Sequence, residues 1–190
     1  MKDNKPKSSN RIRALTEAAV MIALATVLGY FRLYRMPNGG SVDFAMIPIL
    51  LYCLRWGPKW SLGCCLVNGV LQYFLGGGIA ISWQSMLLDY VVAYTLVFLC
   101  GFAAGKKLGW LWGSVLGVLG RWVSMTLAGA LVWYMYMPET FLGLPMVNPW
   151  LYSMLYNGIL CLLVLAVNLI VLGVMQAVPA LRARLFARQN

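Results

Sequence analysis

The chain has 190 residues, of which 62% are hydrophobic and only 11% are charged. Soluble domains are about 45–50% apolar and about 25% charged, and one of this size has too little interior to bury such an excess. The composition therefore excludes a soluble enzyme and indicates an integral membrane protein. The 15 Lys and Arg residues outnumber the 5 Asp and Glu residues, which gives a net charge of +10. In a membrane protein we interpret this excess as an orientation signal and not as nucleic-acid binding.

The residue types that the chain lacks exclude several kinds of chemistry. It has no histidine, which excludes Ser-His-Asp and Cys-His relays and sites where histidine binds a metal or haem. No Gly-x-x-x-x-Gly-Lys-Ser/Thr loop is present, so the chain has no P-loop for ATP. The 5 cysteines lie in apolar stretches without C-x-x-C spacing, which favours buried free thiols. We therefore expect no catalytic residue, no metal site and no intrinsic cofactor.

Apolar stretches of roughly 20 residues are long enough to cross about 30 Å of hydrocarbon as helices. The short second stretch ends before Gly57-Pro58, and the third ends at Gly76-Gly77-Gly78. We predict an all-α membrane protein with six transmembrane helices at 14–181, between basic tails at 1–13 and 182–190. The predicted helices cover residues 14–31, 44–54, 60–75, 82–104, 110–136 and 150–178.

The basic residues orient these helices. If the N-terminus is cytoplasmic, all 15 Lys and Arg residues except Arg32, Arg35 and Arg121 lie in cytoplasmic segments. Arg32 and Arg35 then lie in an outer loop, and Arg121 lies within the fifth helix. Cytoplasmic loops of membrane proteins carry the excess of Lys and Arg. The distribution therefore predicts that both termini are cytoplasmic.

Asp89 is the only acidic residue deep within a predicted helix. Ionisable groups in hydrocarbon are costly, so a carboxylate there indicates either a charged partner or a functional site. One interpretation is an ion pair with Arg121 of the fifth helix. The other is a pocket in which Asp89 accepts hydrogen bonds from an amine or a cationic ligand. The two are compatible if Arg121 lies at the edge of that pocket.

Aromatic residues gather around the loop between the fifth and sixth helices, where an interfacial belt is the common explanation. Trp133 differs because it follows Gly129 by one helical turn, about 40° around the axis. A glycine there leaves room for a flat ligand on which the indole stacks. Tyr152 and Asn157 of the sixth helix are able to face the same cavity.

The outer loop at residues 34–43 contains Pro37 and the pair Gly39-Gly40, which predict a turn with a positive φ angle. This loop joins the first two helices. Its residues are consistent both with a plain connection and with a lid that has Tyr34 as its cap.

Taken in order, these motifs resemble a known family, the thiamine-specific substrate-binding (S) components of energy-coupling factor (ECF) vitamin transporters, or ThiT family. The resemblance covers nearly the whole chain and implies a six-helix S-component-like bundle that captures a vitamin from outside the cell. The stretches that carry it are Thr16–Ala19, Met36–Val42, Ile47–Leu51, Leu54–Lys59, Leu87–Tyr94 and Trp150–Gly158.

The resemblance also implies roles for individual residues. Met125 departs from the family pattern, which has a histidine there, and Ser82-Trp83-Gln84-Ser85 replaces a His-Pro-Val-Gln run. Both changes fall in the expected pocket, so a related pyrimidine or thiazole stays an alternative ligand. The implied roles are ring binding by Asp89, stacking by Trp133, pocket lining by Tyr90, Tyr152 and Asn157, space at Gly129, a basic group near the hydroxyethyl or phosphate end at Arg121, and an aromatic cap at Tyr34.

Family members act with partners, and the resemblance implies the same here. Ala19 and Ala23 form an A-x-x-x-A surface on the first helix, which allows close approach of another helix. The implied partners are a transmembrane coupling subunit and two cytosolic ATPases. The implied location of this chain is the plasma membrane of a prokaryote. Ordinary helix packing is the alternative explanation of the two alanines.

Other functions stay open at this point. An S component for another vitamin and a non-transport assembly protein are both compatible with the composition. An intramembrane hydrolase needs a catalytic pair, which a single deep acid without histidine does not supply.

Overall fold

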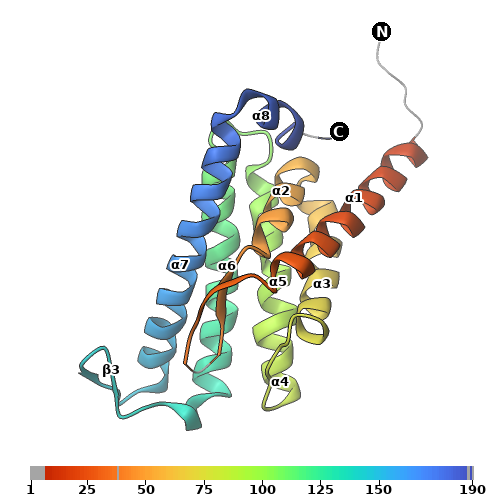
Figure 1. Cartoon of the computed structure of the whole chain (residues 1–190). Helices are drawn as coiled ribbons and strands as arrows, with labels where there is room; N and C mark the ends of the chain where they lie inside the picture. Colours follow the sequence, from red (N-terminus) through yellow and green to blue (C-terminus); the bar gives the residue numbers. More distant parts are fainter. Residues whose placement is uncertain (1–6, 38, 188, 190) are drawn as a thin grey trace.

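The computed structural model describes residues 7–37, 39–187 and 189 and is mostly helical (Figure 1). Parts of the two predicted basic tails, residues 1–6, 188 and 190, lie outside the described residues, as does Asn38 of the predicted loop. In chain order the elements are α1 (Lys7–Leu28), β1 (Arg32–Arg35), β2 (Ser41–Asp43), α2 (Met46–Trp56), α3 (Pro58–Phe74), α4 (Trp83–Met86), η1 (Leu87–Val92), α5 (Ala93–Thr95), η2 (Leu96–Ala103), α6 (Gly109–Leu131), η3 (Tyr134–Tyr136), β3 (Thr140–Phe141), β4 (Leu144–Pro145), α7 (Pro149–Ala177) and α8 (Pro179–Leu185).

A helix lies at each of the six predicted positions. The fourth is one helical run, in which a π-helical segment (η1) and a 3₁₀ segment (η2) interrupt the α-helical hydrogen bonding. Among the described residues, three helices are long and apolar enough to cross a membrane: Trp83–Ala103, Gly109–Leu131 and Pro149–Ala177. The number of spans beyond these three stays a prediction.

α2 lies inside the bundle. All of its residues from Met46 to Trp56 are buried. Its 11 residues span about 16 Å, roughly half the hydrocarbon thickness. The apolar side chains on every side of α2 are therefore explained by its burial within the protein, because a helix that is apolar all round is typically a buried one.

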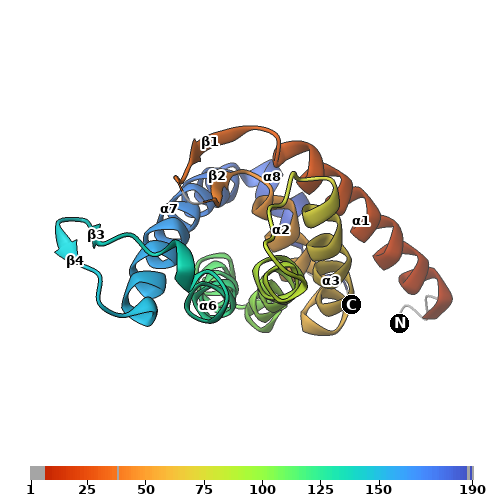
Figure 2. The same cartoon turned by 90° about the horizontal axis from the view of Figure 1, so that it is seen from below.

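The helices form an arc that a hairpin closes. Viewed from below, α7, α6, the run 83–103, α3 and α1 follow one another, and β1–β2 crosses the open side (Figure 2). The start of α1 and α8 lie at one end of the molecule, with α4 and β3–β4 at the other (Figure 1).

The two hairpins depart from the all-α prediction. β1 pairs with β2 in antiparallel register, with Arg32 opposite Asp43 and Arg35 opposite Ser41. The predicted turn is confirmed, because Gly39 and Gly40 have φ angles of 97° and 81°. A short loop between helices becomes a hairpin here because these glycines allow the chain to reverse within a few residues.

The predicted end of the fifth helix at residue 136 is wrong. α6 ends at Leu131, where the amides of Val132 and Trp133 both donate to the carbonyl of Ala128. The chain then enters the single turn η3 and the β3–β4 hairpin. No charge, proline or glycine lies between 131 and 136 to mark this end in the sequence.

One ion pair joins α1 to α2 and is the only one among the described residues. Arg55 pairs with Glu17, and its Nη2 donates to Glu17 Oε2 at 3.3 Å. Arg55 also donates to the carbonyl of Arg184 and accepts at its own carbonyl from the amide of Gln189 at 2.8 Å. The two side chains are only 10% and 15% exposed, so the guanidinium fixes α1, α2 and the C-terminal segment together.

Removing one charge of this pair should destabilise the fold. Loss of one partner of a buried pair leaves the other charge without compensation and costs about 3–5 kcal/mol. We expect Arg55→Met and Glu17→Gln each to lower the melting temperature in detergent, and the double variant to lose less than the sum. Arg11→Met, on the exposed side of α1, is the control. An Arg55→Met protein with the same melting temperature as the wild type would contradict this role.

Candidate functional site

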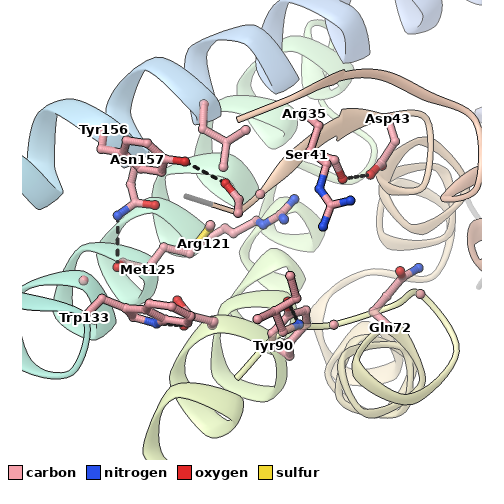
Figure 3. A pocket seen from close by; sticks show the side chains of 18 of the residues that line it. Arg35, Ser41, Asp43, Gln72, Tyr90, Arg121, Met125, Trp133, Tyr156 and Asn157 are labelled. Carbon is pink, nitrogen blue, oxygen red and sulfur yellow. Dashed lines mark hydrogen bonds between the residues drawn. The ribbon is translucent and has the colours of Figure 1, made fainter. Parts of the chain in front are cut away.

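A cavity of about 150 Å³ lies beneath the β1–β2 hairpin, between α3, η1, α6 and α7. Its lining residues come from β1, β2, α3, η1, α5, α6, η3 and α7, and Figure 3 shows part of this lining. Eight of the nine predicted pocket residues line it: Asp89, Tyr90, Arg121, Met125, Gly129, Trp133, Tyr152 and Asn157.

Tyr34, the predicted cap, does not line this cavity. It is 53% exposed and pairs across the hairpin with Val42. Neighbouring side chains on a strand point to opposite faces. The adjacent Arg35 and its cross-strand partner Ser41 line the cavity instead.

The segment that carries Asp89 and Tyr90 is π-helical. π-helical turns leave some backbone carbonyls without their usual partners, and they are frequent at functional sites. Ser124 Oγ of α6 donates to the carbonyl of Leu88 at 2.6 Å. On the other side, a Cβ at Gly69 of α3 would lie 2.9 Å from the carbonyl oxygen of Tyr90. The segment is thus held between α3 and α6, which sets the direction of Asp89.

Asp89 is held by an aromatic residue. Trp133 Nε1 donates to Asp89 Oδ2 at 2.8 Å. The ion pair with Arg121 that the sequence left open is not formed. The carboxylate keeps acceptor capacity for a ligand, since a carboxylate has about four lone-pair sites.

Arg121 lies in the middle of the cavity in Figure 3 and is buried. Its Nη2 donates to Tyr94 OH at 3.3 Å, and its Cζ lies 4.4 Å from the centre of the Tyr94 ring. A cation over an aromatic face is stabilised by the ring quadrupole. Its Nε is buried without a hydrogen-bond partner among the described residues.

α6 and α7 approach each other closely at Gly129, and the space that the sequence predicted beside this glycine is occupied by Ser153 of α7. A Cβ there would lie 2.1 Å from Ser153 Oγ, so only glycine permits this contact. Ser153 Oγ donates to the carbonyl of Thr126 at 2.8 Å, and Asn157 Nδ2 donates to the carbonyl of Met125 at 3.2 Å. Gly129 lines the cavity, but its main effect is to bring Asn157 close to α6.

Three hydrogen bonds hold the hairpin over the cavity. Tyr156 OH donates to the carbonyl of Gly39 at 2.8 Å, which ties the turn to α7. Tyr30 OH and Arg32 Nη2 donate to the carbonyls of Leu75 and Gly76, at 2.6 and 2.8 Å. The first bond joins the hairpin to one side of the bundle, and the other two join its base to the end of α3.

Several lining residues were not predicted. Arg35 pairs with Ser41 across the hairpin, and Arg32 pairs with Asp43. Knowledge of this pairing would have placed Arg35, Ser41 and Asp43 on the same face of the hairpin. Gln72 lies in an apolar stretch of α3, and a buried amide is the signal that would have identified it. The other unpredicted residues include Tyr94, Tyr136, Ser153 and Tyr156.

The arrangement suits binding of a small aromatic ligand with an amine or a positive charge. The Asp89 carboxylate can accept from such a group. Trp133 and Tyr152 add aromatic surface on the same cavity, against which flat rings stack. The amide of Asn157 and the guanidinium of Arg121 add hydrogen-bonding groups on the α6 and α7 side.

Comparisons with known proteins agree with one another. The model of the family described as thiamine transporter protein matches residues 15–182. The thiamine transporter ThiT of Bacillus subtilis is 34% identical over 167 residues, which cover 79% of this chain and 83% of that protein. The ThiT of Lacticaseibacillus paracasei is 27% identical over 180 residues, covering 86% and 87%.

A solved structure shares the fold. The ThiT of Listeria monocytogenes superposes with a TM-score of 0.76 at 22% identity, covering 90% of this chain and 97% of that chain. An identity this low supports the helical architecture and says nothing further of the ligand.

Loss of the bond from Tyr156 should loosen the hairpin alone. We expect Tyr156→Phe to raise amide hydrogen exchange at residues 35–41 several-fold, because local opening then breaks one bond fewer. Hydrogen exchange followed by mass spectrometry measures this. Tyr134→Phe, at an exposed tyrosine outside the cavity, is the control. Equal exchange in the wild type and Tyr156→Phe would show that this bond does not hold the hairpin.

Proposed function

Because the chain belongs to the thiamine transporter family, we propose that it captures thiamine from outside the cell in the cavity beneath the β1–β2 hairpin. The observation that carries this proposal is the Asp89–Trp133 pair at the cavity wall, a carboxylate and an indole joined at 2.8 Å. Thiamine offers both groups a partner, since it has two aromatic rings, an exocyclic amine and a positive charge on the thiazolium ring.

The cavity chemistry suits each part of this ligand. The Asp89 carboxylate accepts from the amine and offsets the ring cation. The Trp133 indole stacks on a ring, and a cation over Trp is the strongest of the aromatic pairings. Arg121 lies in the middle of the cavity in Figure 3, where its guanidinium adds hydrogen-bond donors beside the bound ligand.

Closure of the hairpin would retain the ligand. Tyr156 and Arg32 hold the hairpin to α7 and to the end of α3. The ligand enters when these bonds open, and it is removed from water when they form again. Exclusion of water strengthens the contact of Asp89 with the ligand.

Uptake requires partners, and we propose that this chain is the substrate-binding component of an ECF transporter. It has no P-loop, so ATP hydrolysis would come from two cytosolic ATPases acting through a membrane coupling subunit. Ala19 and Ala23 lie exposed on α1, which supports this face as the docking surface. The distribution of Lys and Arg supports six spans in a prokaryotic plasma membrane, with both termini cytoplasmic.

Met125 favours one alternative, an S component for a related pyrimidine or thiazole compound. Its side chain lines the cavity, and a thioether cannot donate a hydrogen bond. A ligand that needs a donor at this point would therefore bind less well than one that presents apolar surface to it.

Neutralising Asp89 should weaken thiamine binding strongly. Hydrogen bonds to charged groups contribute about 1.5–3 kcal/mol, which corresponds to about 10- to 150-fold in the dissociation constant. We expect Asp89→Asn to lose that factor in calorimetric titration of the purified protein with thiamine. Glu139→Gln is the matched control, since Glu139 is exposed and does not line the cavity. A wild type that binds a thiazole or pyrimidine analogue but not thiamine would favour the alternative, and no binding of any of them would refute the proposal.

Bulk on the α1 surface should separate binding from uptake. We expect Ala19→Trp and Ala23→Trp to abolish thiamine uptake by whole cells, because a large side chain prevents close helix approach. Binding to the purified variants should be unchanged. Val123→Trp, on the exposed side of α6, is the control. Normal uptake by both alanine variants would exclude this face as the docking surface.

A further inference from the structure

Gln72 on α3 is a cavity residue to which the proposed function assigns no role. It lines the cavity and is only 5% exposed. Its Nε2 has no hydrogen-bond partner among the described residues. A buried amide without a partner costs about 1–3 kcal/mol, so an amide at a cavity wall is expected to bond whatever occupies the cavity.

The end of α3 fixes this side chain. The carbonyl of Gln72 accepts from the amide of Gly76 at 3.1 Å, which closes the last helical turn. A Cβ at Gly76 would lie 2.7 Å from Gln72 Oε1 and 2.5 Å from its backbone oxygen. Glycine at 76 therefore leaves the room in which the amide lies. The next residues, Gly77 and Gly78, also line the cavity and leave this wall without side chains.

Gln72 and Trp133 lie on opposite sides of the cavity, with Tyr90 between them (Figure 3). Polar residues of the hairpin gather on the Gln72 side, where Ser41 Oγ donates to Asp43 Oδ2 at 2.8 Å. A two-ring ligand that stacks on Trp133 beside Asp89 therefore extends its other end towards Gln72.

We propose that the side-chain amide of Gln72 hydrogen-bonds the hydroxyl group of the ligand's hydroxyethyl arm. This rests on the proposed function, since it takes thiamine as the ligand with its rings at Trp133. A hydroxyl both donates and accepts, as does a primary amide, so the pair is satisfied in either amide orientation. Gln72 then selects ligands that carry a hydroxyl at this position.

A cycle with two ligands and two proteins tests the contact. The ligands are thiamine and its analogue with ethyl in place of hydroxyethyl, and the proteins are the wild type and Gln72→Leu. We expect Gln72→Leu to bind thiamine about 3- to 10-fold more weakly, the range for one neutral hydrogen bond. The wild type should lose a similar factor with the analogue, and Gln72→Leu should bind the two ligands equally. Calorimetry supplies all four dissociation constants.

Asn68 provides the matched control. It lies one turn before Gln72 on α3, is fully buried, and neither polar atom of its side chain has a partner among the described residues. It does not line the cavity. Asn68→Leu should therefore bind both ligands as the wild type does. Gln72→Met, closer in shape, repeats the test if Gln72→Leu melts at a lower temperature.

The possible outcomes separate this inference from the proposed function. Thiamine affinity that is unchanged in Gln72→Leu and Gln72→Met would overturn the inference and leave the proposed function standing. Losses that are equal for thiamine and the analogue would also overturn it, because the amide would then contact another part of the ligand. A wild type that binds neither ligand would overturn both.

Discussion

Polar groups inside an apolar bundle must find partners within the protein, because hydrocarbon offers none. This requirement determines how the cavity is built. Asp89 is held by Trp133, and Arg121 is held by Tyr94, so neither charge depends on the other. Keeping the two charges apart leaves the carboxylate free to meet a cationic ligand, whereas a direct ion pair would have satisfied it already.

The backbone provides the geometry for these contacts. A π-helical segment carries Asp89, and Ser124 of α6 takes up the carbonyl of Leu88 next to it. Gly129 allows α6 and α7 to approach until Asn157 reaches the carbonyl of Met125. Helix packing and the ligand site therefore depend on the same contacts. A substitution at such a contact is therefore expected to change stability and affinity together.

The sequence predicted most of the helices and eight of the residues that line the cavity, and the physical reasons differ between the two. Apolar stretches predict helices because hydrocarbon length sets their size. Asp89 was identified because a carboxylate in that setting is costly. Tyr34 was predicted to face the cavity, where the structure has Arg35. The difference arises from a bulge between Arg32 and Tyr34, which changes the register of the hairpin and which no sequence signal marks. The end of α6 was missed because Trp133 continues the apolar pattern beyond the last helical turn.

The central claim is that thiamine binds against Trp133, and tryptophan fluorescence tests it most directly. The chain has 8 tryptophans, and only Trp133 lines the cavity. Titration of the purified protein with thiamine should quench part of the emission with saturation at one ligand per chain. Trp133→Phe should abolish that quenching while the other tryptophans still emit. Equal quenching of the wild type and of Trp133→Phe would place the ligand elsewhere and contradict the account.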